Sequence, residues 1–181
     1  MAEPSSMLLE PRNTLDKAAS SYLRSAMHQP VHWQEWGEAA FALAAQADKP
    51  ILLDVGAVWC HWCHVMDRES YEDATLAAMV NEHFVAIKVD RDERPDVDAR
   101  YQAAVQAISG QGGWPLTAIL TPDGRPFFAG TYFPRDVYKR QAVDNTAAQE
   151  FYVRHGFART GRIPGYYLGR IDALAMEKQL G

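Results

Sequence analysis

Cysteine is scarce in this sequence, which has two cysteines in 181 residues. Long apolar runs are absent as well, since no stretch approaches the ~20 apolar residues that a membrane-spanning helix needs. The first residues, MAEPSSMLLEPRNTLDKAASSYL, have an early acidic residue and no apolar run behind a basic start, so we expect no secretory signal. These absences favour a cytoplasmic protein without membrane contact, in which two cysteines are more often catalytic or metal-binding than structural.

Basic charge is also in short supply. The chain has 18 Lys and Arg against 23 Asp and Glu, which gives a net charge of −5 at pH 7. Binding to the phosphates of nucleic acid needs a concentrated basic surface, so we expect no nucleic-acid partner. Hydrophobic residues make up 48% of the chain, which is ordinary for a globular protein and enough for one sizeable core.

Strands alternate with helices along the first three quarters of the chain. Residues 1–12 are polar, contain two prolines, and are predicted to form a disordered tail. Apolar periodicity, caps and turn residues predict helical segments at 13–27, 34–47, 59–67, 72–81 and 95–108, and strands at 51–55, 84–89, 116–120 and 125–129. The last two strands enclose a turn at 121–124 and form a hairpin. This order predicts an α/β fold with a mixed sheet flanked by helices.

The two cysteines stand three residues apart where a predicted strand turns into a helix, in the run Cys60-His61-Trp62-Cys63-His64. The free N–H groups and the positive dipole end at a helix start stabilise an anion, so Cys60 is predicted to be an activated thiolate. Cys63, one turn further on, can attack a mixed disulfide that Cys60 forms with a substrate. A protonated His61 or His64 would favour the thiolate further.

Several interpretations of this motif stay open on these residues alone. Besides a redox dithiol, the cysteines could be a structural pair without chemistry. They could bind zinc together with the flanking histidines, although a structural zinc site usually draws its second ligand pair from elsewhere in the chain. The run also matches the C-x-x-C-H pattern of covalent haem attachment. Such attachment normally takes place after the protein has been exported. The redox interpretation fits the preceding strand best, and the main alternative is a non-catalytic module that docks a partner or zinc.

An acidic run, DRDERPDVD, occupies residues 90–98. Its alternating carboxylates could be taken for a cation-binding loop. The run lacks the glycine and the terminal glutamate of an EF-hand, however. We therefore interpret it as the solvated start of a helix at Pro95.

The residues around the dithiol resemble a thioredoxin fold. The run 51–54 followed by Trp59-Cys60 is similar to the strand, buried aspartate and Trp-Cys step of that fold, and Gly113-Trp114-Pro115 resembles its cis-proline loop. The resemblance implies that Cys60 attacks, that Cys63 resolves, and that Asp54 manages the proton of Cys63 through a buried path. It also implies that the bond before Pro115 is cis and that this loop presents backbone groups to a substrate strand.

The same resemblance implies a substrate groove beside the dithiol. Trp114 and Pro115 would shape this groove, while His61 and Trp62 would tune redox potential and access. The neighbouring Trp59 and His64 complete the candidate set around the cysteines. The expected partner is a protein or small-molecule disulfide, and we expect neither a cofactor nor a metal.

A narrower resemblance covers about residues 13–134. Its motifs are Asn13, Tyr22-Leu23, His28, Pro30-Val31, Trp33, Trp36, Ala40-Phe41, the run 60–66, Lys88-Val89-Asp90-Arg91, residues 93–98, residues 110–115 and Thr131-Tyr132-Phe133-Pro134. Together they resemble the spermatogenesis-associated, YyaL-type thioredoxin-domain family. Members of that family carry a large all-α toroid after this domain, so we expect activities that depend on the toroid to be absent here. The resemblance implies thiol–disulfide chemistry, but it does not identify the substrate on which this chemistry acts.

The sequence changes character after residue 134. Residues 136–141, DVYKRQ, can be encoded by the end sequence of a transposase adapter used for sequencing libraries, so we interpret 135–141 as an artefactual or linker join. The run from Asn145 to Tyr152, with Gly156-Phe157 after it, then resembles the closing helix of a GNAT N-acetyltransferase. In that family the matching asparagine contacts the cofactor and the matching tyrosine often serves as general acid.

Residues 142–181 are predicted to be a C-terminal α/β fragment with a helix at 142–155 and a strand at 166–174. The glycine-rich phosphate loop and the first half of a GNAT domain do not precede it, so acetyl-CoA would have no pyrophosphate cradle. A segment of about 40 residues rarely folds unaided. We therefore expect this fragment to be inactive and to bind no acetyl-CoA.

Overall fold

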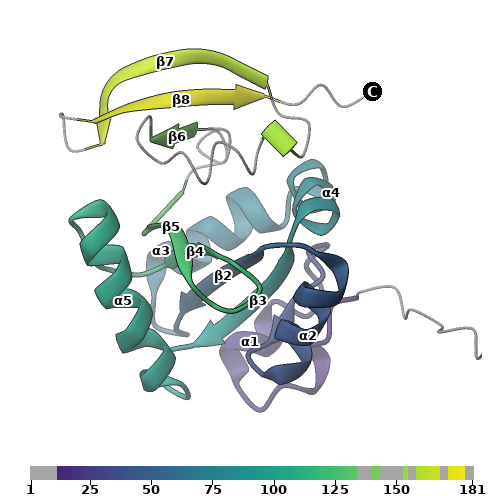
Figure 1. Cartoon of the computed structure of the whole chain (residues 1–181). Coiled ribbons are helices and arrows are strands. Elements are labelled where there is room, and N and C mark those ends of the chain that lie inside the picture. Colours follow the sequence, from purple (N-terminus) through teal and green to yellow (C-terminus); the bar gives the residue numbers. More distant parts are fainter. Residues whose placement is uncertain (1–11, 134–139, 143–152, 155–157, 168–170, 178–181) are drawn as a thin grey trace, which may run out of the picture.

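The computed structural model describes residues 12–133, 140–142, 153–154, 158–167 and 171–177. A five-stranded mixed sheet forms the centre of the larger part, in the order β1-β3-β2-β4-β5 (Figure 1). Its strands are β1 (Gln34–Glu35), β2 (Ile51–Gly56), β3 (Val85–Asp90), β4 (Leu116–Leu120) and β5 (Pro126–Gly130). β1, β3 and β2 run parallel to one another. β4 is antiparallel to β2, and β5 is antiparallel to β4. This is the mixed sheet of a thioredoxin-like α/β fold, as predicted.

The helical segments lie between these strands along the chain. They are η1 (Leu15–Lys17), α1 (Ser21–Ser25), α2 (Glu38–Ala47), α3 (His61–Met66), η2 (Asp67–Tyr71), α4 (Ala74–His83) and α5 (Pro95–Ser109). The start signals that were predicted for two of them are present. Asp73 caps α4 by accepting a hydrogen bond from the backbone N–H of Leu76 at 2.9 Å, and Pro95 occupies the first turn of α5.

Successive side chains of the buried strands point to opposite faces of the sheet, so there is a hydrophobic core on each face. Leu52 of β2 and Ala86 of β3 pack in a cluster with residues of η1, α1, α3 and α4. Leu53 and Ile87 belong to the second cluster, together with residues of α2 and α5. All six residues of β2 are buried, which confirms the predicted strand covered on both sides.

Two predicted boundaries in this part were wrong or incomplete. The helix expected at 34–47 begins only at Glu38, because Gln34 and Glu35 pair in parallel with Ile87 and Lys88 of β3. The helical stretch expected at 13–27 is split into η1 and α1. The hairpin is confirmed: the N–H of Gly124, a residue at φ 83°, donates to the carbonyl of Thr121 at 2.8 Å.

The C-terminal part contains a second, antiparallel sheet of β6 (Arg140–Ala142), β8 (Ile171–Glu177) and β7 (Ala158–Tyr167), in that order. The single strand predicted at 166–174 was wrong, because its two ends belong to β7 and β8. A register shift between Ile163 and Tyr167 accommodates the Pro164-Gly165 step. Ala142 lies in a strand, so the predicted helix does not begin there. Residues 143–152 and 155, which include Asn145 and Tyr152, lie outside the described residues.

Candidate active site

The dithiol lies where β2 leads into α3, as the sequence predicted. Cys60 and Cys63 form a disulfide, and their Cα atoms are 5.3 Å apart. Cys60 is the N-cap residue of α3, and its Sγ accepts a hydrogen bond from the backbone N–H of Cys63 at 3.1 Å. After reduction, the same N–H and the positive end of the helix would face a thiolate at Cys60. The exposed fractions are 5% for Cys60 and 2% for Cys63, so both residues are buried and Cys60 is slightly the more accessible of the two.

Exposed aromatic side chains surround this sulfur pair. Trp59 is 55% exposed and Trp62 is 56% exposed, which is unusual for the largest apolar side chains in a folded protein. The Trp62 ring lies 5.5 Å from the Tyr132 ring and 5.5 Å from the His61 ring, measured between centroids. Tyr132 donates to Glu69 at 2.6 Å, and this hydrogen bond raises the pKa of Tyr132 to about 12. One wall of the site is therefore aromatic and keeps its phenol protonated.

Arg91 holds two tryptophans, Trp59 and Trp114, beside the dithiol. Its guanidinium lies 5.6 Å from the ring centroid of Trp59 and 4.7 Å from that of Trp114, within cation–π range of both. The Trp59 indole N–H donates to Asp92 and the Trp114 indole N–H donates to Asp98, each at 2.8 Å. The acidic run at 90–98 is thus more than a solvated helix start, because two of its carboxylates fix the tryptophans beside the dithiol.

The peptide bond between Trp114 and Pro115 is cis, which confirms the bond geometry predicted from the resemblance. Pro115 is buried and directly precedes β4. Leu116, the first residue of β4, pairs with Val55 near the end of β2. Pro115 therefore lies at the end of the sheet from which the chain enters the dithiol helix.

A buried charge cluster lies behind the dithiol, on the face of the sheet that carries α1 and α3. Asp54 of β2 is 1% exposed and stands in register with Lys88 of β3. The Lys88 ammonium donates to Asp54 at 2.7 Å and to Asp67 at 2.9 Å. The hydroxyls of Tyr22 and Tyr71 donate to the two Asp54 oxygens at 3.5 and 3.4 Å. One cation, two carboxylates and two phenols thus share a dry site.

Burial and charge act in opposite directions within this cluster. Burial raises the pKa of Asp54 above its ordinary value even though Lys88 acts to lower it. Burial alone would lower the pKa of Lys88, but the charges of Asp54 and Asp67 outweigh this effect and raise it well above the ordinary value. Lys88 is therefore a fixed cation, and Asp54 is a carboxylate with increased proton affinity.

The flanking histidines do not converge on the sulfurs as zinc ligands. The His64 Nε2 atom lies 2.7 Å from the Val58 carbonyl oxygen, and the exposed His61 ring stands against Trp62. Across the ranges that the structure describes, no three His, Cys, Asp or Glu side chains are placed to hold one metal ion. Across the same ranges, no helix has the length and apolar character needed to cross a membrane.

The sequence analysis missed Lys88, Asp67 and the two tyrosines as parts of the site. A usable signal was present: Lys88 interrupts the apolar residues of the strand Val85–Asp90, which is buried along its whole length and has Asp90 as its last residue. A lysine in such a strand requires a buried carboxylate partner. The parallel register that pairs Lys88 with Asp54 could not be obtained from one sequence.

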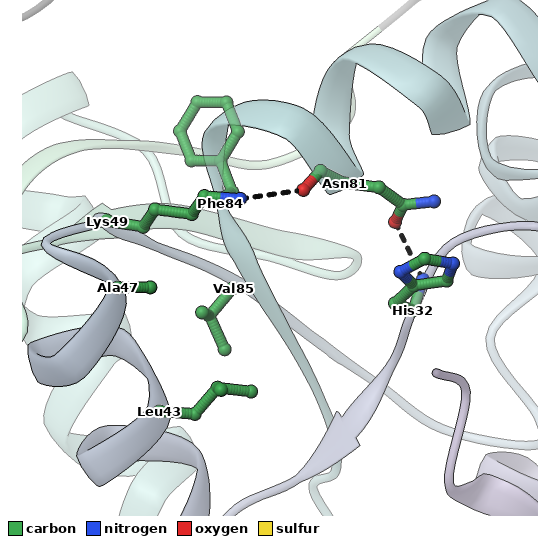
Figure 2. A pocket seen from close by; sticks show the side chains of 7 residues that line it. All are labelled: His32, Leu43, Ala47, Lys49, Asn81, Phe84 and Val85. Carbon is green, nitrogen blue, oxygen red and sulfur yellow. Dashed lines mark hydrogen bonds between the residues drawn. The ribbon is translucent and has the colours of Figure 1, made fainter. Parts of the chain in front are cut away.

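A small pocket lies away from the dithiol, between α2, α4 and the start of β3. Figure 2 shows its lining side chains, His32, Leu43, Ala47, Lys49, Asn81, Phe84 and Val85. The Lys49 ammonium donates to the Asn81 carbonyl at 3.1 Å, and the Asn81 side chain accepts from the backbone N–H of His32 at 2.8 Å. None of these residues belongs to the charge cluster or to the dithiol, so we assign the pocket no part in the chemistry.

Comparison with known proteins places this chain in a family. Residues 12–151 match the family Thioredox_DsbH, described as a protein of unknown function, DUF255. An uncharacterized protein of Caenorhabditis elegans is 52% identical over 125 residues, which cover 69% of this chain and 17% of that protein. Human spermatogenesis-associated protein 20 is 47% identical over 133 residues, which cover 74% of this chain and 17% of that protein. The chain spans about one sixth of the length of these relatives.

Solved structures with a related chain trace include one titled DsbH oxidoreductase. It is 20% identical in sequence, with a TM-score of 0.47, and the match covers 57% of this chain and 74% of that one.

Proposed function

We propose that this chain, which belongs to the Thioredox_DsbH family, carries out thiol–disulfide exchange through Cys60 and Cys63. The chain has a thioredoxin-like disulfide oxidoreductase fold with a C-x-x-C disulfide pair. The observation that carries the proposal is the place of this pair: Cys60, the slightly more exposed residue, caps the start of α3, and Cys63 lies one turn further along the helix. This arrangement supports Cys60 as the nucleophile and Cys63 as the resolving group.

The proposed cycle is a two-electron exchange. In the reduced protein, the Cys60 thiolate attacks a substrate disulfide, forms a mixed disulfide, and releases one substrate thiolate. Cys63 then loses its proton and attacks the Cys60 sulfur, which re-forms the intramolecular disulfide and releases the second substrate thiolate. Asp54 accepts the proton of Cys63, because its buried carboxylate has a raised proton affinity.

Aromatic side chains define the proposed substrate groove. Trp59 and Trp62 offer exposed apolar surface beside the sulfurs, and the half-buried Trp114 lies next to Trp59. An extended substrate segment would lie against the loop at the cis bond before Pro115. His61 and Trp62 would tune redox potential and access. A protein or small-molecule disulfide fits such a groove, and we propose this substrate class.

Trapping the mixed disulfide tests the proposed function directly. In the Cys63→Ser variant, Cys60 can attack glutathione disulfide but no resolving thiol remains, so a stable glutathione adduct is expected at Cys60. The matched Cys60→Ser variant leaves only the deeper sulfur, and it is expected to form the adduct much more slowly. Intact-protein mass spectrometry after acid quench measures both. Equal labelling of the two variants would contradict the assigned roles.

Alkylation of Cys60 separates this function from a non-catalytic binding module. In the Cys63→Ser variant, the pH dependence of iodoacetamide labelling is expected to give a pKa well below the ordinary thiol value of about 8.5. An ordinary pKa together with tight zinc retention by the wild-type protein would favour the binding module instead.

We also propose the domain division inferred from the sequence: a tail at 1–12, a thioredoxin-like domain at 13–134, a join at 135–141 and a fragment at 142–181. The GNAT resemblance of that fragment, the YyaL-type relationship and the cytoplasmic location stay predictions. Calorimetric titration with acetyl-CoA tests the fragment. No binding is expected, and saturable binding would require a role for Asn145 and Tyr152.

A further inference from the structure

We propose that Tyr22 carries the proton of the Cys63 thiol to Asp54 when the reduced site resolves a mixed disulfide. This inference rests on the proposed function and adds a residue to it. Tyr22 belongs to α1, far from the dithiol in the sequence, yet its side chain is fully buried behind the site. Its hydroxyl donates to the Asp54 carboxylate at 3.5 Å.

Gly56, the last residue of β2, brings the phenol and the sulfur together. A Cβ at this position would collide with the Tyr22 hydroxyl oxygen and would lie 2.8 Å from Cys63 Sγ. Both atoms therefore border the same point in space, which stays open only because residue 56 has no side chain. Within the described residues, Asp54 accepts hydrogen bonds from Tyr22, Tyr71 and Lys88. Of these three donors, Tyr22 is the one whose hydroxyl is also among the three atoms nearest to the Gly56 Cβ position, beside Cys63 Sγ.

The surroundings of Tyr22 keep it in the protonated form that a relay needs. Burial raises the pKa of Tyr22 well above its ordinary value. The charged groups that face it are Lys88, whose ammonium lies 5.0 Å from the ring centroid, and the carboxylates of Asp54 and Asp67. The His64 ring meets the Tyr22 ring edge at a centroid distance of 6.3 Å.

The step balances in protons and charge. The Tyr22 oxygen accepts the proton of the Cys63 thiol while its own proton moves to the Asp54 carboxylate. The result is a Cys63 thiolate, a neutral Tyr22 and a neutral Asp54. The Cys63 thiolate then attacks the Cys60 sulfur of the mixed disulfide, and the electron pair of that S–S bond leaves with the substrate thiolate. Lys88 keeps its charge throughout, because two carboxylates raise its pKa.

Tyr71 provides a matched control within the same cluster. It also donates a phenol hydrogen bond to Asp54, at 3.4 Å, and it also faces Lys88. Its hydroxyl is not one of the three atoms that lie nearest to a Cβ built at Gly56. A Tyr71→Phe variant therefore removes a second phenol hydrogen bond from the Asp54 carboxylate and leaves Tyr22 in place.

The experiment compares wild-type protein, Tyr22→Phe and Tyr71→Phe in a single turnover. Reduced full-length protein is mixed with excess glutathione disulfide, quenched in acid at increasing times, and analysed by mass spectrometry. Formation and resolution of the mixed disulfide then give separate rate constants. For Tyr22→Phe we expect unchanged formation and resolution that is about tenfold or more slower at pH 7. The resolution rate of Tyr22→Phe should also keep increasing with pH up to a higher pH than the rate of wild type does. The reason is that Cys63 must lose its proton to solvent in this variant.

Three results would overturn the inference. Resolution in Tyr22→Phe at the wild-type rate excludes the relay, and an equal slowing in Tyr71→Phe shows that the effect acts through Asp54 alone. Failure of glutathione disulfide to oxidise the reduced wild-type protein to the Cys60–Cys63 disulfide refutes the proposed function itself, and the relay with it. A measurement that needs no variant supports the same point: resolution in wild-type protein should slow in D2O while formation does not.

Discussion

Lys88 has its full charge in the interior of the sheet, where an unpaired ammonium would cost several kcal/mol. Two carboxylates and three aromatic rings compensate for this burial: the Lys88 ammonium lies 5.0 Å from the Trp33 ring centroid, as it does from that of Tyr22, and 5.3 Å from that of Tyr71. Burial first, and the negative charge of Asp67 after it, raise the pKa of Asp54, although Lys88 acts to lower it. Asp54 therefore holds a proton more readily than an aspartate in water, which suits a residue that must accept one.

Replacing Asp54 by Asn should remove a pH dependence from the resolution step. The ionised carboxylate is the proton acceptor, and burial raises its pKa. The resolution rate of wild-type protein should therefore fall as the pH drops through a value above that of an ordinary aspartate. Asp54→Asn should be about tenfold or more slower at pH 7 and should lack this inflection. The single-turnover assay with glutathione disulfide, repeated across pH 4–9 at about half-unit steps, measures both.

A matched control for this change is Asp96→Asn. Asp96 is fully exposed at the start of α5, and its hydrogen bond with Arg94 lowers its pKa to about 2. This variant should resolve the mixed disulfide as the wild type does at every pH. An unaltered inflection in Asp54→Asn would show that another group accepts the proton.

At the scale of elements, β2 ends at a glycine because α1 and α3 both approach it. α1 supplies Tyr22 and α3 supplies Cys63, and a side chain at residue 56 would displace both. A strand end that admits two helices so closely has no room for a methyl group.

Gly56→Ala should therefore destabilise the fold by about 1–3 kcal/mol. The control is Gly37→Ala, at which an added Cβ meets nothing within 4 Å, so its cost should stay below about 1 kcal/mol. Urea unfolding followed by tryptophan fluorescence measures the free energy of unfolding of each variant. The double variant Tyr22→Phe with Gly56→Ala should lose less than the sum of the single losses, since the phenol oxygen is part of the collision. Strict additivity would contradict the proposed contact.

At the scale of the whole molecule, both hydrophobic clusters lie between Leu15 and Phe133, among the residues whose burial the structure describes. Every residue that we assign to the redox site lies in that stretch as well. A fragment of residues 12–134 should therefore fold by itself and keep the chemistry.

This fragment should unfold within a few degrees of the full chain and should form the glutathione adduct at the same rate. Differential scanning calorimetry and the trapping assay in the Cys63→Ser background test the two statements. A fragment that fails to unfold cooperatively would show that residues after 134 stabilise the domain, which would contradict the proposed domain division.

The sequence by itself determined the elements of the site that are local in the chain. The start of α3 at the cysteine pair, the strand before it and the hairpin at 121–124 all follow from short runs of residues, whereas the cis bond at Pro115 was implied by the resemblance to a thioredoxin fold. Local backbone preferences, capping and periodicity are physical properties of such runs, and they are present whatever the rest of the chain does. The place of the C-x-x-C pair, at the start of a helix that follows a buried strand, was therefore predictable.

Only the tertiary structure decided what lies behind and beside the sulfurs. The pairing of Lys88 with Asp54 depends on the register of two parallel strands, and the place of Tyr22 depends on how α1 packs against the end of β2. The contacts of the Arg91 guanidinium with the Trp59 and Trp114 rings require three separate segments of the chain to meet. Such contacts join residues more than twenty positions apart, and packing across the sheet rather than any local preference brings them together.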